Sequence, residues 1–116
     1  MPVIKVWCLP KLSERRLRGI YKRIVAAVLK VTELRLKDEK SLTVLFPADM
    51  MKFGLGEKII VEVTGLFEND ERTAAVRDKL AFYLTVEMRE LFPKTRIECF
   101  IYPFNREQGF CQAKEK

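Results

Sequence analysis

Apolar positions along the first part of the chain predict a strand followed by a helix. Residues 2–9 are rich in β-branched and aromatic side chains and end at Pro10, which is typical of a strand. Ser13 is a good helix N-cap and Glu14 follows it in the first turn. Apolar residues then recur at helical spacing, so the pattern predicts a helix over residues 13–31.

The rest of the chain continues the alternation of strands and helices. Short β-branched runs predict further strands over residues 42–46, 58–64 and 96–102. A second amphipathic helix is expected between the last two strands, with Asn69 or Asp70 as its N-cap. The order is therefore β-α-β followed by β-α-β.

This order predicts the fold class, α/β (α+β), in one domain over residues 1–116. A helix that crosses between two strands normally makes them parallel, so two such units form a four-stranded sheet with both helices on one face. The other face is then uncovered, and we place Leu45, Val61, Val63 and Ile101 on it. Because these side chains are too apolar to face water, a second subunit is expected to cover them.

Composition and charge narrow the possible partners. The chain is 48% apolar and 33% charged, which is an ordinary globular mixture, and we expect it in the cytoplasm, away from membranes. Its net charge of +6 permits an anionic partner, but Lys and Arg occur along the whole chain between acidic residues. A small anionic substrate is therefore expected, and no nucleic acid.

The absence of histidine removes several classes of site. Histidine-based zinc sites, Ser-His-Asp triads and Cys-His dyads are all excluded. Three widely spaced cysteines fit neither a disulfide framework nor a metal knuckle. We expect no metal and no cofactor.

A base that needs no histidine is available at the start of the chain. Pro2 follows Met1, and a small second residue usually allows the initiator methionine to be removed. The terminal amine of proline is then free, and burial or nearby cations lower the pKa of such an amine from about 8. Pro2 is therefore a candidate general base at neutral pH.

Several short motifs resemble one known family. They are the opening MPVIKV, the pair of β-α-β units, the stretch 46–54, and residues 65–66 with 72–73. Together they resemble the tautomerase superfamily, which includes 4-oxalocrotonate tautomerase, macrophage migration inhibitory factor and cis-3-chloroacrylic acid dehalogenase. The resemblance covers nearly the whole chain and implies a tautomerase-like fold and a homotrimer.

The resemblance also implies roles for individual residues. Pro2 falls on the catalytic proline, and Arg72 falls near an arginine that holds the substrate carboxylate. Arg106 is a second candidate anion ligand, and Thr64 falls where relatives present backbone groups beside the proline. Glu107 resembles the acid that positions water in the dehalogenase-like members.

Departures from the family leave three functions open. The arginines of the short tautomerases are replaced by Leu12 and Thr43, and the histidine of the dehalogenases is missing. The first function is a tautomerase acting on a keto/enol carboxylic acid with Pro2 as general base. The second is a hydratase or dehalogenase-like enzyme on unsaturated acids, with protonated Pro2 as acid and Glu107 orienting water. The third is a binding relative without turnover.

Overall fold

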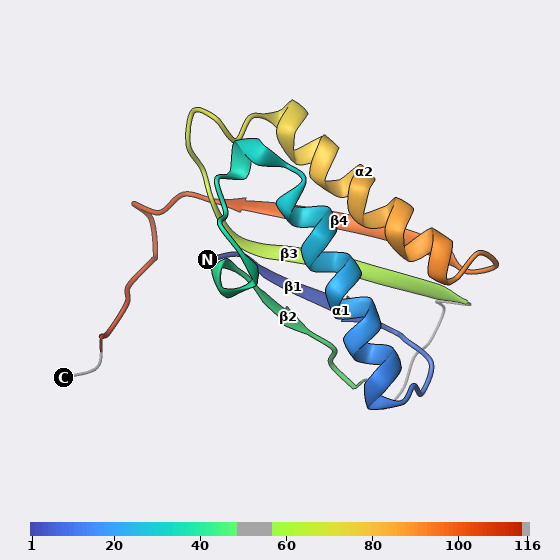
Figure 1. Cartoon of the computed structure of the whole chain (residues 1–116). Coiled ribbons are helices and arrows are strands. Elements are labelled where there is room, and N and C mark those ends of the chain that lie inside the picture. The colour runs from blue at the N-terminus through green and yellow to red at the C-terminus, as the bar shows by residue number, and fades with distance from the viewer. Residues whose placement is uncertain (49–56, 115–116) are drawn as a thin grey trace.

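The chain folds into one sheet and two long helices, as the sequence predicts. The structure is a computed structural model that describes residues 1–48 and 57–114. Its elements, in order (Figure 1), are β1 (Val3–Trp7), α1 (Glu14–Leu29), the 3₁₀ turns η1 (Thr32–Leu34) and η2 (Glu39–Ser41), β2 (Thr43–Leu45), β3 (Lys58–Phe67), α2 (Ala74–Leu91) and β4 (Arg96–Phe104).

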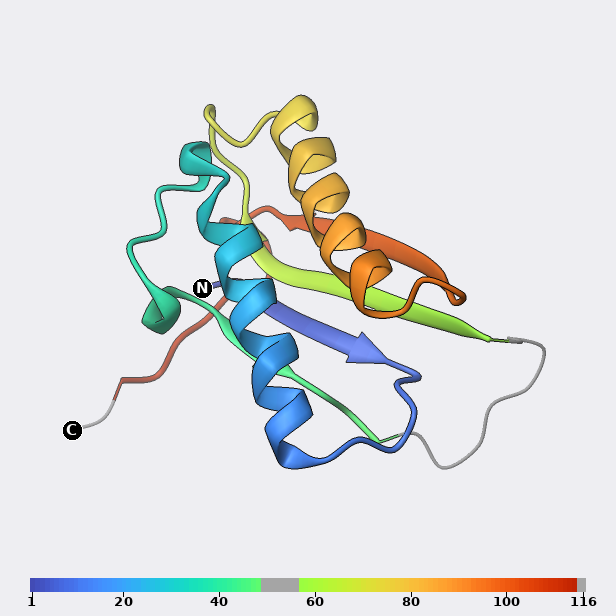
Figure 2. The same ribbon diagram turned by 45° about the vertical axis from the view of Figure 1, so that its right-hand side comes forward.

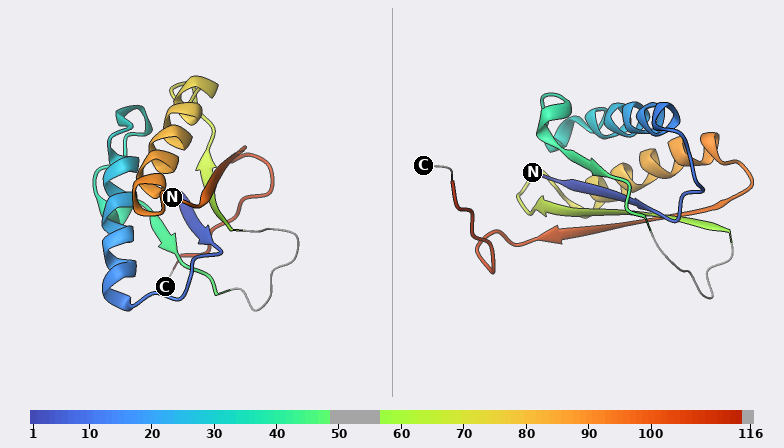
Figure 3. Two further views of the ribbon diagram at one scale, coloured as in Figure 1. Left: turned by 90° about the vertical axis from the view of Figure 1, so that its right-hand side faces the viewer. Right: turned by 90° about the horizontal axis from the view of Figure 1, so that it is seen from below.

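The sheet joins two parallel pairs of strands through an antiparallel centre. The strand order is β2-β1-β3-β4. β1 and β2 are parallel, β3 and β4 are parallel, and β1 and β3 run in opposite directions. Both helices lie on the same face of the sheet, as Figure 3 shows from the side. The predicted fold class is confirmed.

The two helices begin at capping residues, one of them expected and one not. Ser13 caps α1, its hydroxyl accepting a hydrogen bond of 3.2 Å from the Arg16 amide. Thr73 caps α2 and accepts from the Val76 amide, so the predicted cap at Asn69 or Asp70 is wrong. The Asn69 side chain instead accepts from the Arg72 amide in the preceding turn.

The core lies between the helices and one face of the sheet. Ile4 and Val6 of β1 and alternate residues of β3, including Val61 and Val63, are buried among helix side chains such as Leu84. Val63 pairs with Ile101 on β4, so Ile101 also points toward the helices. The prediction that Val61, Val63 and Ile101 lie on the uncovered face is therefore wrong.

The uncovered face carries a different set of apolar side chains. Leu45 is 44% exposed there, as predicted, and Phe100 and Tyr102 are similarly exposed. Trp7 and Ile60 lie half-buried between them, and the Trp7 indole N–H donates to the Glu62 carboxylate. Exposed aromatic area therefore remains on this face, although its residues differ from those expected.

Two remaining expectations concern membranes and the stretch 46–54. No helix of the described residues combines the length and the apolar character that crossing a bilayer requires. Most of the stretch 46–54, including Gly54, lies outside the described residues.

Candidate active site at the N-terminus

Pro2 is buried at the end of the sheet where β1 begins. Its carbonyl oxygen accepts a hydrogen bond of 3.0 Å from the amide of Thr43, just ahead of the parallel pairing of β1 with β2. On the other side, Val3 pairs with Thr64 of β3. The start of the chain is thus held between β2 and β3, and Figure 2 shows it at the same end of the sheet as the start of the C-terminal segment.

A glycine in β3 allows this close approach. Gly65 has a φ of +69°, and the register of β3 against β4 shifts between Val63 and Leu66. A β-carbon at residue 65 would stand 2.8 Å from the carbonyl oxygen of Met1 and 3.8 Å from the Cα of Pro2. Gly65 therefore lies in a bulge inside the strand rather than in a turn after it, and the bulge faces the terminus.

The terminal amine lies in a positive environment. Partial burial lowers the pKa of the Met1 amine below its ordinary value, and the guanidinium groups of Arg72 and Arg106 lower it further. Both arginines were expected near the terminus from the family resemblance. An amine with a lowered pKa is neutral at a lower pH, which is what a general base requires.

Arg72 is held by backbone carbonyls from two different segments. Its terminal nitrogens donate to the Phe67 carbonyl at 2.9 Å and to the Leu34 carbonyl at 3.0 Å. Its Nε is buried and has no hydrogen-bond partner among the described residues. Burial lowers the pKa of the guanidinium, and the nearby Glu71 opposes that shift.

This position differs from the one that an N-cap at Asn69 or Asp70 implies for Arg72, which is the first turn of the second helix. The residue precedes the N-cap Thr73 instead of lying in the first turn of α2. Its charge is fixed in place beside the terminus, because both terminal nitrogens are engaged with carbonyls. Sequence patterns contain no sign of these long-range partners.

Arg106 lies against aromatic rings at the start of the C-terminal segment. Its guanidinium carbon is 5.3 Å from the ring centre of Phe67 and 5.8 Å from that of Phe110. The Phe67 and Phe110 rings meet edge to face at 4.8 Å, and the Phe104 ring is 6.3 Å from Phe67. We call Phe67, Phe104 and Phe110 the aromatic cluster.

The aromatic cluster was only partly anticipated. Phe104 lies just after the last predicted strand, where its ring is a candidate to line a pocket, whereas Phe67 and Phe110 are not predicted to do so. The available signal was the run of aromatic residues on both sides of Arg106. Phe100, which the sequence also offers as a candidate to line a pocket, lies on the uncovered face of the sheet.

The two remaining candidates lie in different surroundings. Thr64 is half-buried opposite Val3, next to the terminus. Glu107 is exposed in a turn where its amide donates to the Asn105 side chain at 3.0 Å. Among the described residues its carboxylate forms no hydrogen bond or ion pair. The structure thus gathers Pro2, Thr64, Arg72 and Arg106, and leaves the Glu107 carboxylate without a contact to them.

No group of three potential metal ligands occurs in the part of the chain that the structure describes. The groups that the described residues bring to the terminus are an amine, two guanidinium groups and a set of aromatic rings.

Comparisons with known proteins identify the fold. No family model matches the chain, and no curated protein matches it. Among solved structures, N1 of the cis-3-chloroacrylic acid dehalogenase family matches with a TM-score of 0.70 and 10% identity, over 97% of this chain and 81% of that one. The chain has the tautomerase fold.

Further matches share the tautomerase fold. A fused wild-type 4-OT, described as a symmetric trimer, has a TM-score of 0.66 and 13% identity, over 90% of this chain and 86% of that one. Pt0534, solved after inactivation by 2-oxo-3-pentynoate, has a TM-score of 0.63 and 15% identity, over 87% and 85%. Proteins of unknown function from Vibrio cholerae and Sebaldella termitidis also match. The fold expected from the family resemblance is confirmed.

Proposed function

We propose that this protein is a tautomerase-type isomerase that moves a proton within a keto/enol carboxylic acid, with the amine of Pro2 as its general base. The proposal includes loss of Met1, which exposes that amine. One observation carries it: burial and the charges of Arg72 and Arg106 lower the pKa of the Met1 amine, and the Pro2 amine would form one residue further along the chain, at the same end of the sheet.

The proposed reaction is a transfer of one proton between two atoms of the substrate. The neutral Pro2 amine accepts a proton from the carbon next to the substrate carbonyl, and negative charge develops on the enolate oxygen. Protonated Pro2 then returns the proton to another substrate atom, so the amine is regenerated and no other reactant is consumed. Positive charge beside the amine stabilises the enolate.

The two arginines suit different parts of this task. Arg106 is exposed and makes no ion pair among the described residues, so its guanidinium is available for a substrate carboxylate. Arg72 is already bonded to two carbonyls and supplies a fixed positive potential. Thr64 and the aromatic cluster are proposed to border the substrate.

The hydratase alternative has less support. It needs Glu107 to orient a water beside Pro2, and that carboxylate is exposed without a described contact. Pt0534, which shares the fold, is inactivated by 2-oxo-3-pentynoate, so this acid is a suitable reactive probe for the amine of the present protein.

The experiment begins with the intact mass of the purified protein, which reports whether Met1 has been removed. Turnover is then measured on phenylenolpyruvate and 2-hydroxymuconate, together with covalent labelling by 2-oxo-3-pentynoate. Pro2→Ala should abolish most of the turnover, and Pro93→Ala, a change at an exposed proline after α2, should leave it unchanged. Retained Met1 in an active protein, or full activity of Pro2→Ala, would contradict the proposal.

We also propose that the chain is a single domain over residues 1–116 and assembles as a homotrimer through the uncovered face of the sheet. Exposed Leu45, Phe100 and Tyr102 support this assembly, because such apolar area normally lies in an interface. A matching fused 4-OT is described as a trimer.

A further inference from the structure

The net positive charge of this protein is concentrated in one segment. Residues 11–30 contain seven of the 22 basic residues and one of the 16 acidic residues. The difference of six positive charges equals the whole net charge of +6, so basic and acidic residues are equal in number in the rest of the chain. Basic residues are spread along the chain, as noted above, but in this segment they outnumber acidic residues by seven to one.

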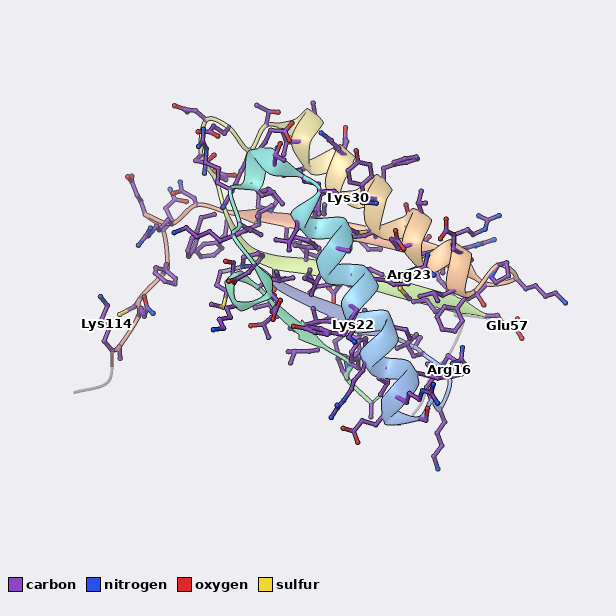
Figure 4. The ribbon with its side chains drawn as sticks, viewed as in Figure 1. Arg16, Lys22, Arg23, Lys30, Glu57 and Lys114 are labelled. Atoms are coloured by element: carbon purple, nitrogen blue, oxygen red, sulfur yellow. The ribbon has the colours of Figure 1, made fainter. Side chains whose placement is uncertain are left out.

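The segment includes α1, whose outer side carries the charge. Arg15, Lys22 and Lys30 are exposed and recur on one side of the helix, with Gly19 and Ala26 between them. Figure 4 shows Lys22 and Lys30 along this helix, while Arg23 points toward α2. We call Arg15, Arg16, Lys22 and Lys30 the basic face.

The basic face is not neutralised by the protein itself. Arg18 pairs with Glu14 at 2.7 Å, and Arg23 pairs with Glu87 at 2.7 Å. By contrast, none of the four side chains of the basic face forms an ion pair or a side-chain hydrogen bond among the described residues. Their charge is free for an external anion.

The spread of basic residues along the sequence predicted no nucleic-acid partner, but the folded chain brings together on α1 exposed cations that form no ion pair within its described part. We propose that the basic face binds the phosphate backbone of double-stranded nucleic acid without reading its sequence. The exposed positions of α1 are basic, apart from Glu14, Gly19 and Ala26, and lysine and arginine are the side chains that contact phosphate oxygens independently of sequence. The 16 residues of α1 span about 24 Å, and duplex DNA presents one negative charge per ~1.7 Å of its axis. Gly19 has no side chain and Ala26 has only a methyl group, so a phosphate backbone has room between the basic side chains.

A membrane surface fits this face less well. Helices that lie in a bilayer interface insert large apolar side chains. The exposed large apolar residues of the described chain lie on other elements, and those of α1 are turned into the core. A purely electrostatic partner of high charge density is therefore the better match.

The test measures binding of a fluorescent duplex of arbitrary sequence by anisotropy, from 50 to 200 mM salt. The variant Arg15→Gln/Lys22→Gln/Lys30→Gln is compared with Lys40→Gln/Lys94→Gln/Lys114→Gln, which removes the same charge from exposed positions elsewhere. Circular dichroism of both variants verifies that they fold.

The basic-face variant should bind weakly, and the slope of log affinity against log salt should fall by about 2.7, since each phosphate contact contributes ~0.9. The control variant should keep the slope of the unsubstituted protein. Equal losses in both variants, no binding by the unsubstituted protein at 50 mM salt, or binding only to phosphatidylserine vesicles would overturn the proposal. The outcome is independent of turnover at the N-terminus.

Discussion

Gly65 lies directly against Met1. A β-carbon at residue 65 would stand only 2.8 Å from the carbonyl oxygen of Met1. The contact couples the bulge in β3 to the place where the chain begins. Any side chain at residue 65 must move one of the two backbones.

Replacing Gly65 with alanine should destabilise the protein by about 1–3 kcal/mol, because alanine is strained at positive φ and, in the chain that keeps Met1, its methyl group meets the Met1 carbonyl. Chemical denaturation measures the change. Gly19→Ala is the matched control, since Gly19 lies in α1 with open space around it and should gain about 0.5–1 kcal/mol. Similar effects of the two changes would show that residue 65 is not constrained.

Replacing Arg72 with methionine should cost about 1–3 kcal/mol of unfolding free energy, because the carbonyls of Leu34 and Phe67 lose their shared donor. Arg106→Met should cost much less, since Arg106 is exposed and contacts only rings. Thermal and denaturant unfolding of both variants checks the difference. A stable Arg72→Met would mean that water replaces the guanidinium at both carbonyls.

Replacing Arg106 with glutamine should raise the pKa of the terminal amine, because one of the two charges that lower it is removed. The pH at which tautomerase turnover rises should move upward with it, since turnover needs the neutral amine. NMR titration of the amine and pH-rate profiles measure both quantities. Arg96→Gln, at the far end of β4, is the control and should leave both unchanged. A rate that falls as pH rises through this pKa would instead favour the hydratase function.

Cys99 should react with iodoacetamide far more slowly than Cys111 at pH 8. Burial raises the pKa of the Cys99 thiol to about 12, so little thiolate forms, while Cys111 is exposed. Peptide mapping after timed alkylation measures each rate. Unfolding in urea should remove most of the difference, and equal rates in the folded protein would place Cys99 in contact with solvent.

Replacing Phe100 with glutamate should dissociate the proposed trimer, because the change places a charge on the uncovered face of the sheet. Phe82→Glu is the matched control, since Phe82 is 62% exposed on α2, on the helix side of the molecule. Sedimentation velocity at micromolar concentration distinguishes trimer from monomer. A monomeric unsubstituted protein would contradict the proposed assembly.

The sequence predicts the elements well because their signals are local. The alternation of β-branched residues and the capping residue Ser13 each depend on neighbours a few positions away. The same alternation places Val61 and Val63 on one face and Ile60 and Glu62 on the other. The prediction was wrong about which of the two sets faces the helices. In the structure Val61 and Val63 are buried beneath the helices.

The candidate site is less predictable because its contacts are long-range. The bond from Arg72 to the Leu34 carbonyl spans 38 residues, and the stacking of Arg106 on Phe67 depends on how the C-terminal segment folds back. Pro2, Arg72 and Arg106 were nevertheless named as candidates, with the help of the family resemblance, and the structure places both arginines near the start of the chain. The position of Gly65 inside a strand was missed, because glycine after a strand usually indicates a turn.

The hydrogen bond from the Thr43 amide to the Pro2 carbonyl can form whether or not Met1 is present. The pairing of β1 with its neighbours begins at Val3, and the peptide nitrogen of Pro2 carries no hydrogen. Removal of Met1 thus breaks no hydrogen bond between strands. Chains with and without Met1 should therefore share one sheet. The unprocessed chain then serves as a natural control, with the same sheet as the mature chain but with the amine of Met1, and not that of Pro2, at its end.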